Sequence, residues 1–173
     1  MSNQNLQIVL AQRPQGLLDP ATTFKQQYVP IPSEIPDSHV LVKVLYLSLD
    51  PAMRGWMNDV RSYIPPVKIG AIMRGDTVGV VVQSKHADFK KGDNVQSVVG
   101  WQQYALVDGK KLKKLAIPKG ISITDYLGPL GGTGMTAYFG LLDVGQPKKG
   151  DTVVVSGAAG ATGSVVGQIA KIM

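Results

Sequence analysis

The segment from residue 152 to residue 173 restricts the fold of this chain more than any other. Residues 152–156 read TVVVS, a short apolar run, and a glycine-rich loop and a helical pattern from about Ala161 follow it. The apolar residues of that pattern recur at helical spacing: Val165, Val166, Ile169, Ile172 and Met173. An apolar strand that leads through a loop into an amphipathic helix is typical of a parallel sheet covered by helices. The segment therefore predicts the first βα unit of a Rossmann α/β domain.

Glycines concentrate where the predicted strand passes into the helix, in residues 156–163, which read SGAAGATG. Glycine there lets the backbone turn sharply and approach a pyrophosphate, and the helix N-terminus supplies free N–H groups. The spacing Ala158-x-Gly160-x-x-Gly163 is the dinucleotide fingerprint with Ala in place of its first glycine. A flexible turn is the alternative interpretation, but the flanking strand and helix favour cofactor binding. The loop is not a P-loop, because no Gly-Lys-Ser/Thr follows.

Before Pro118 the chain reads as a series of short strands. These segments are rich in Val, Leu, Ile and Tyr and are separated by Gly, Pro, Asp and Asn, a pattern that predicts a small β-barrel or sandwich. The predicted strands are residues 7–12, 24–31, 40–49, 76–83, 94–99, 102–107 and 112–117. After Pro118 we expect a helix capped by Ser122 or Thr124 and running through Leu130, and a second helix over residues 135–142.

The length of the chain limits its domain organisation. A doubly wound dinucleotide fold uses about six parallel strands, and these 173 residues contain only the first. We therefore expect a fragment or truncated product of a longer enzyme. The predicted parts are a mostly β barrel domain over residues 1–120, connecting helices over 121–145, and the start of a truncated Rossmann domain over 146–173.

The composition excludes several classes. The chain has no Cys, which rules out a disulfide-stapled secreted module and a zinc site with Cys ligands. It shows neither a leader pattern nor an apolar run long enough to cross a membrane, so we expect a soluble, cytoplasmic protein without a membrane partner. The two histidines, His39 and His86, lie far apart in sequence and are expected to be ordinary surface residues rather than metal ligands.

The net charge of +6 comes mostly from one short stretch. Its four lysines are Lys110, Lys111, Lys113 and Lys114. One local cluster is not a basic face, so the charge does not predict a nucleic-acid partner. We expect a solvated turn and strand edge here, because edge strands commonly carry Lys to block pairing. Attraction of a polyanionic ligand, such as a phosphorylated cofactor, remains the alternative.

Four stretches of the chain resemble a known family. They are residues 47–54 (LSLDPAMR), 131–140 (GGTGMTAYFG), 149–156 (KGDTVVVS) and 158–171 (AAGATGSVVGQIAK). In combination they resemble the zinc-independent medium-chain dehydrogenases/reductases, in the group of prostaglandin reductase (leukotriene B4 dehydrogenase), plant alkenal double-bond reductases and bacterial curcumin reductase. The resemblance covers all 173 residues but only the amino-terminal half of such an enzyme.

The resemblance implies a GroES-like barrel followed by a Rossmann domain that binds NADPH, with the active site in the cleft between them. Members of this group reduce the carbon–carbon double bond of α,β-unsaturated ketones and aldehydes without a metal. Hydride attacks the β-carbon, and the developing enolate oxygen needs a hydrogen-bond donor. The resemblance also implies a small-molecule enone or enal as partner and a homodimeric full-length enzyme.

The family's cofactor-binding positions can be carried over to this chain. By resemblance they are Pro51, Ala52, Met135, Thr136, Ala158, Ala159, Gly160, Ala161, Thr162, Gly163 and Ser164. The catalytic residues are unknown, because the tyrosine that stabilises the enolate and the residues that bind the 2′-phosphate are expected beyond Met173. Helix packing is an equal alternative role for Met135. Arg54 is expected to cap a short helix or, alternatively, to orient an acidic substrate group.

The chain also departs from the family pattern. Ala52 and Asp76 stand where many members carry aromatic residues, and Gly132-Thr133-Gly134 replaces Met-Pro-Gly. Since stacked rings are a main way to hold a flat enone, the substrate is left open. Two other functions also remain open, a quinone reductase of the same superfamily and a truncated, non-catalytic barrel module.

Overall fold

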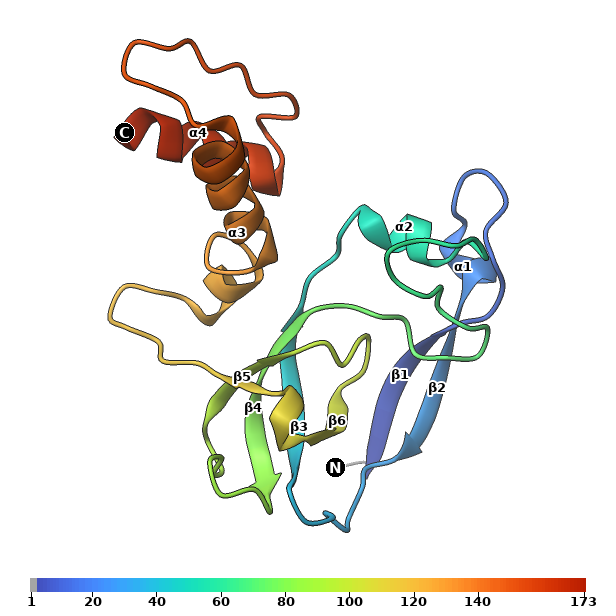
Figure 1. Cartoon of the computed structure of the whole chain (residues 1–173). Helices are drawn as coiled ribbons and strands as arrows, with labels where there is room; N and C mark the ends of the chain where they lie inside the picture. The colour runs from blue at the N-terminus through green and yellow to red at the C-terminus, as the bar shows by residue number, and fades with distance from the viewer. Residues whose placement is uncertain (1–2) are drawn as a thin grey trace. The chain divides into compact units, whose positions relative to one another are not determined.

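The computed structural model describes residues 3–173, and the chain divides into two compact units. One unit ends at Ala116 and consists mainly of β-strands, and the other, Ile117–Met173, contains only helices and loops. Figure 1 shows the strands in blue to yellow and the helical unit in orange to red. The mostly β barrel followed by the start of an α/β domain, as predicted from the sequence, is confirmed at this level.

The first unit begins with a two-stranded antiparallel sheet. Strand β1 (Gln4–Leu10) pairs with β2 (Phe24–Pro30) without interruption, from Gln4 opposite Pro30 to Leu10 opposite Phe24. Between them lies the one-turn helix α1 (Pro20–Thr23), where the Asp19 carboxylate accepts a hydrogen bond from the Ala21 N–H at 3.0 Å. Proline at the first helical position suits this start, because its missing N–H would have no intrahelical acceptor.

A second, five-stranded sheet is antiparallel throughout and has the order β6-β3-β4-β5-β7. Its strands are β3 (His39–Leu47), β4 (Thr77–Ser84), β5 (Asn94–Ser97), β6 (Tyr104–Asp108) and β7 (Lys113–Lys114). Loops of this part of the chain bond back to β1: the Ile8 N–H donates to the Trp101 carbonyl at 2.9 Å, and the Met73 N–H donates to the Ile8 carbonyl at 2.9 Å. These bonds join the two sheets into the GroES-like barrel.

Two separate apolar clusters form the core of the first unit. The barrel cluster consists of Val40, Val42, Val81, Phe89, Val95, Ala105 and Val107. The methionine cluster consists of Leu10, Met53, Met57, Val67 and Met73, and Phe24, Trp56 and Trp101 pack against it. Because the second cluster draws on loops and a short helix rather than on the sheet alone, it organises the irregular segments around residues 50–75.

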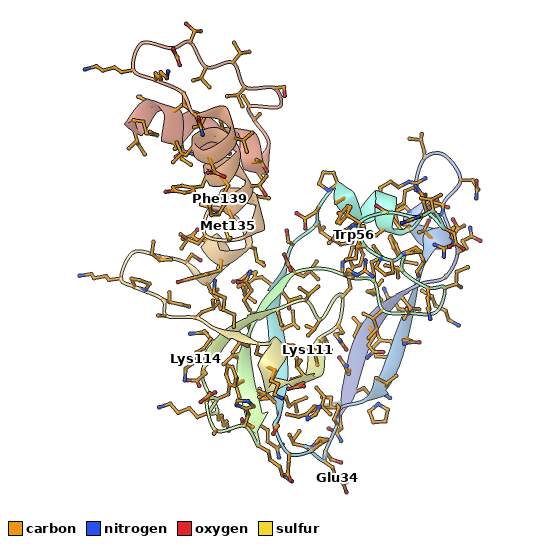
Figure 2. The ribbon with its side chains drawn as sticks, viewed as in Figure 1. Glu34, Trp56, Lys111, Lys114, Met135 and Phe139 are labelled. Carbon is orange, nitrogen blue, oxygen red and sulfur yellow. The ribbon has the colours of Figure 1, made fainter. Side chains whose placement is uncertain are left out.

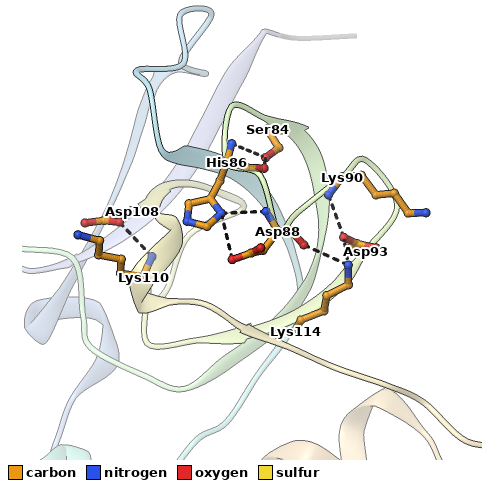
Figure 3. A network of polar contacts seen from close by, with 8 residues as sticks. All are labelled: Ser84, His86, Asp88, Lys90, Asp93, Asp108, Lys110 and Lys114. Carbon is orange, nitrogen blue, oxygen red and sulfur yellow. Dashed lines mark hydrogen bonds and ion pairs between the residues drawn. The ribbon is translucent and has the colours of Figure 1, made fainter.

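The lysine-rich segment lies at a strand edge, as predicted. Strand β7 is the last strand of the five-stranded sheet, and Lys113 and Lys114 are both exposed. Figure 3 shows that Lys114 points to Asp93, with 2.7 Å between Nζ and Oδ2. This lysine, together with a hydrogen bond from the Lys90 N–H, holds the pKa of Asp93 below its ordinary value. The cluster therefore interacts with acidic groups of the barrel itself.

His86 differs from its prediction as a surface residue. Its side chain is 17% exposed, and its ring lies 5.3 Å from the Phe89 ring, centroid to centroid. A side chain at Gly109 would collide with this ring. The ring thus covers the barrel cluster next to the turn that carries the lysines, because the half-apolar imidazole packs well on Phe89 and a glycine.

The second unit has shorter helices than the sequence predicts at its start. The segment after Ser122 forms only a 3₁₀ turn, η2 (Ile123–Leu127), with a capping box between Ser122 and Asp125. It is followed by α3 (Gly132–Phe139), a π-helical turn η3 (Gly140–Gly145) and α4 (Ala161–Ile172). Helix α3 packs against α4. Residues 152–155, predicted as a strand, have no regular secondary structure, because no strand in residues 3–173 pairs with them.

Candidate functional site

The first unit contains an apolar cavity of about 530 Å³ beside α2 (Ala52–Trp56). Most of its walls are aliphatic, thioether or aromatic side chains. The lining residues are Leu18, Pro20, Phe24, Leu49, Asp50, Pro51, Met53, Arg54, Met57, Met73 and Trp101. Its volume lies in the range of pockets that bind small molecules, which is about 300–1,000 Å³.

Helix α2 positions one wall of this cavity. The chain turns at Asp50-Pro51, where the Met53 N–H donates to the Asp50 carbonyl at 3.0 Å and the Arg54 N–H donates to the Pro51 carbonyl at 3.1 Å. The Ser48 hydroxyl donates to the Asp50 carboxylate at 3.1 Å and holds it at the turn. Met53 and Met57 are four residues apart, so they share one helical face, and both are buried.

An aromatic pair forms another part of the wall. The Phe24 and Trp101 ring centroids are 5.1 Å apart, and the ring planes are tilted by 42°. Gly75 lies against this wall: a Cβ there would be 3.0 Å from the Met53 Cε and 3.2 Å from the Trp101 Nε1. The absence of a side chain at Gly75 therefore lets the indole and the thioether pack closely.

Arg54 holds a loop of its own unit. Its guanidinium donates to the Asn58 side-chain oxygen at 2.6 Å and to the carbonyl oxygens of Pro14 and Gly16 at 3.1 and 3.0 Å. These bonds attach the loop before α1 to α2. These bonds fit neither of the two roles predicted from the sequence, since the arginine anchors a neighbouring loop instead of capping the helix or facing a substrate group.

Two carboxylates lie close together beside the cavity. Asp76 is half-buried, and its carbonyl accepts a hydrogen bond from the Ser48 N–H at 2.9 Å. Burial, and to a lesser extent the neighbouring charge of Asp50, raises the pKa of Asp76 above its ordinary value. Asp50 itself lines the cavity. The electrostatics on this side of the cavity therefore disfavour a further negative charge.

The second unit contains the glycine loop at the start of α4. Gly157 has a φ of +59°, a conformation that favours glycine, and its carbonyl accepts from the Gly160 N–H at 2.8 Å. A side chain at Gly163 would overlap the Gly157 carbonyl, so the loop lies directly on the first turn of the helix. Gly160 is the N-cap of α4, and no side chain caps this helix.

This geometry fits a phosphate group. The first N–H groups of a helix have no intrahelical acceptor, and α4 provides no side-chain oxygen to accept from them. The residues around them are small, and Ala158, Ala159, Gly160 and Ala161 are exposed. An anion at this position would accept hydrogen bonds from these N–H groups and interact favourably with the helix dipole.

The predicted cofactor residues outside the glycine loop differ in their exposure and in whether they line the cavity. Pro51 lines the cavity, whereas Ala52 is exposed and is not part of its lining. Met135 and Phe139, one helical turn apart on α3 (Figure 2), are 56% and 52% exposed and therefore free to contact a ligand or another part of the protein. Thr136 is also exposed, but its hydroxyl donates to the Gly132 carbonyl at 2.8 Å.

Two further predicted positions lie on the first turn of α4. The Ser164 hydroxyl donates to the Ala161 carbonyl at 3.4 Å, which directs it back along the helix. Thr162 is half-buried beside the loop. Of the predicted set, the residues from Ala158 to Ser164 come together as one loop and helix start.

Most of the cavity was not predicted from the sequence. Leu18, Phe24, Met57, Met73 and Trp101 come from segments far apart in the chain, and each one by itself reads as a core residue. A weak local signal was present, since Met53 and Met57 form a helical pair directly after the Asp50-Pro51 turn. Nothing in the sequence pattern connects that pair to Trp101.

Residues 3–173 contain neither a metal-binding cluster of side chains nor a helix that could span a membrane. No three His, Cys, Asp or Glu side chains in this range gather closely enough to hold a metal ion. None of the helices in the same range has the length and apolar character needed to span a membrane.

Comparisons with known proteins agree on one family. The family described as the N-terminal domain of oxidoreductase matches residues 6–115. The NADPH-dependent curcumin reductase of Escherichia coli (strain K12) is 47% identical over 171 residues, which cover 98% of this chain and 48% of the reductase. Prostaglandin reductase 1 of Mus musculus is 44% identical over 138 residues, which cover 79% of this chain and 40% of the mouse protein.

A solved structure with a bound cofactor is also similar. The crystal structure of CurA in complex with NADPH from Vibrio vulnificus matches with a TM-score of 0.84 and 47% identity, and the match covers 96% of this chain and 49% of CurA. The chain thus spans about half the length of the relatives it matches.

Proposed function

Since the chain belongs to the oxidoreductase family whose N-terminal domain matches residues 6–115, we propose that it is the amino-terminal part of an NADPH-dependent enone reductase. The proposed reaction is the metal-free reduction of the carbon–carbon double bond in α,β-unsaturated ketones and aldehydes. The uncapped, glycine-lined start of α4 carries this proposal, because it offers free N–H groups to a phosphate. The names of the E. coli and mouse relatives support the reaction class.

The two units have different roles in this proposal. The loop from Ala158 to Ser164 binds the pyrophosphate through backbone N–H groups, and the apolar cavity beside α2 binds the substrate. NADPH supplies the hydride when it is bound. We place the domain boundaries at residues 1–120, 121–145 and 146–173, as the sequence predicts. We also propose that the complete enzyme is a homodimer, on the strength of the sequence resemblance alone.

The cofactor role of the loop can be separated from its structural role by substitution at Gly160 in the complete reductase. Gly160 has the φ and ψ of an ordinary N-cap, −78° and 169°. A Cβ at Gly160 would lie 3.2 Å from the Gly157 carbonyl oxygen, a close contact that Asp and Asn share. Both are good N-caps, so Gly160→Asp and Gly160→Asn should affect the stability of α4 to a similar extent. Only Gly160→Asp places a negative charge at the phosphate position. We expect it to raise the NADPH Michaelis constant by about tenfold or more relative to Gly160→Asn.

Steady-state kinetics with varied NADPH and thermal unfolding of both variants make this comparison. Equal Michaelis constants in two equally stable variants would show that the loop does not bind the pyrophosphate. The reaction class is tested in the wild-type enzyme by following NADPH oxidation with an enone such as 4-phenyl-3-buten-2-one. Oxidation with quinones but not with enones would instead assign the protein to the quinone reductases.

A further inference from the structure

We propose that the barrel carries a second binding site, for a small apolar molecule that bears one carboxylate. The site is another cavity of the first unit, with a volume of about 450 Å³, which we call the side cavity. Its lining comes from the start of β3, from β6 and the turn after it, and from residues 97–99 at the end of β5. It shares no lining residue with the cavity beside α2, so the inference goes beyond the proposed reaction.

The apolar part of the side cavity lies along β6, an end strand of the five-stranded sheet. Side chains from both faces of this strand line it: Val107 is buried in the barrel cluster, whereas Leu106 is 36% exposed. Val98, from the segment at the end of β5, also lines it and is 62% exposed. A hydrocarbon group in the side cavity would remove these aliphatic side chains from water, which favours its binding.

The polar part of the side cavity has more basic than acidic groups. The titratable residues of its lining are His39, Asp108 and Lys111. The Asp108 carboxylate already has a partner, because it accepts a hydrogen bond from the Lys110 N–H at 3.0 Å (Figure 3). This hydrogen bond, followed by the charges of His39, Lys110 and Lys111, lowers the pKa of Asp108. One carboxylate therefore faces two lysines and a histidine, and a second carboxylate can be accommodated.

Lys111, in the turn after β6 (Figure 2), is the cation available to a ligand. Its side chain is exposed, and its ammonium group forms no hydrogen bond or ion pair within residues 3–173. Lys114 of the same segment differs, because its ammonium group already pairs with the Asp93 carboxylate. An exposed ion pair adds little affinity by itself. The ligand therefore needs both a carboxylate for Lys111 and an apolar part for Val98 and Leu106.

Three ligands separate the contribution of the charge from that of the apolar chain. Octanoate has both groups, octanamide has the same chain without the charge, and acetate has the charge without the chain. The affinities are taken from nitrogen-15 NMR titrations of the 173-residue chain at neutral pH and low salt, on the amide resonances of Val98 and Leu106. We expect octanoate to bind about fivefold more tightly than octanamide, and acetate to bind too weakly to measure. The amides of Met53 and Trp101 report separately on the cavity beside α2.

Matched substitutions test the two parts of the site. Lys111 and Lys113 are both exposed, but of the two only Lys111 lines the side cavity. We expect Lys111→Gln to weaken octanoate binding about fivefold without changing octanamide binding, and Lys113→Gln to change neither. Val98 and Val60 are 62% and 60% exposed, and of the two only Val98 lines the side cavity. Val98→Ser should weaken both ligands about threefold, and Val60→Ser should weaken neither.

Thermal unfolding checks that these variants fold, which we expect because all four side chains are exposed. Equal affinities for octanoate and octanamide, or equal effects of the two lysine variants, would overturn the carboxylate site. Acetate binding as tight as that of octanoate, or equal effects of the two valine variants, would overturn its apolar part. Octanoate that shifts only the amides of Met53 and Trp101, or that does not bind, would overturn the proposal as a whole. None of these outcomes bears on the proposed reductase reaction, which uses the other cavity and the glycine loop.

Discussion

At the scale of single residues, Asp76 has the most unusual environment near the cavity. It is half-buried, and the charge of Asp50 acts on it. Burial, followed by the charge of Asp50, raises its pKa. The folded protein therefore binds a proton at Asp76 more tightly than the unfolded chain does, and an ionised Asp76 destabilises the fold.

The sign of the pH dependence follows from this shift. Between the ordinary pKa of 3.8 and the raised value, the folded state holds more protons, so the free energy of unfolding falls as the pH rises. We expect Asp76→Asn to be more stable than the wild type at neutral pH. The two proteins should be equally stable below about pH 3, where Asp76 is protonated in both the folded and the unfolded state. Urea unfolding of the two proteins at both pH values measures the difference.

The variant Asp50→Asn serves as a control for the cause of the shift. The asparagine side chain still accepts from the Ser48 hydroxyl, but the neighbouring charge is gone. The pKa of Asp76, followed by carbon-13 NMR, should move only part of the way back, because burial is its larger cause. A stability difference between Asp76→Asn and wild type that grows toward low pH would contradict the assigned direction.

The candidate site was partly predictable at this scale. Asp50-Pro51 and the loop from Ala158 to Ser164 are local motifs, so turn chemistry and glycine spacing reveal them. Arg54 was predicted as a helix cap or a substrate contact, whereas its actual bonds go to the carbonyl groups of Pro14 and Gly16, which no local sequence pattern connects to it. Trp101 was not predicted as a site residue, because the sequence around a tryptophan does not show which side chains surround it in the fold.

At the scale of elements, the sequence predicts an element correctly when the interactions that stabilise it join residues close together in the chain. Helix α4 begins at Ala161 as expected, because the backbone hydrogen bonds that stabilise a helix join residues close together in the chain. The predicted strand at residues 152–156 does not form, because a strand needs a neighbour for its ladder. Strand β7 is shorter than predicted and consists of Lys113–Lys114, which pair with Gln96 and Val95 of β5.

The missing ladder leaves apolar side chains exposed in the second unit. Val154 is 89% exposed and Ile172 is 84% exposed. Exposed apolar patches promote association, so the double variant Val154→Lys/Ile172→Lys should self-associate less than the wild-type chain. Sedimentation velocity over a concentration series measures this. The variant Gln12→Lys/Gln15→Lys adds the same number of charges at exposed polar positions, and an equal effect there would attribute the result to net charge.

At the scale of the whole molecule, the division into two units predicts two cooperative transitions. Leu10 is fully buried in the methionine cluster of the first unit. Leu10→Ala should destabilise that unit by about 2–5 kcal/mol, which lowers its unfolding temperature by on the order of 10 °C. The amides of α4 should keep their protection against hydrogen exchange. Calorimetry combined with residue-resolved hydrogen exchange tests this.

The control is Leu17→Ala, which removes the same atoms from a side chain that is 97% exposed. It should leave both transitions unchanged, because little apolar contact is lost. Equal loss of protection in both units upon Leu10→Ala would mean that the chain unfolds as one cooperative block and that the division does not extend to stability.

The sequence by itself determined the elements and motifs of this protein: the series of barrel strands, the helices, the glycine loop and the resemblance to a reductase family. These features depend on residues that are neighbours in the chain, so periodicity and spacing reveal them. Only the tertiary structure decided that Leu18, Phe24, Met73 and Trp101 line a cavity beside α2, and that Arg54 holds a neighbouring loop. Such contacts form between segments that are distant in the chain, so local sequence patterns do not predict them.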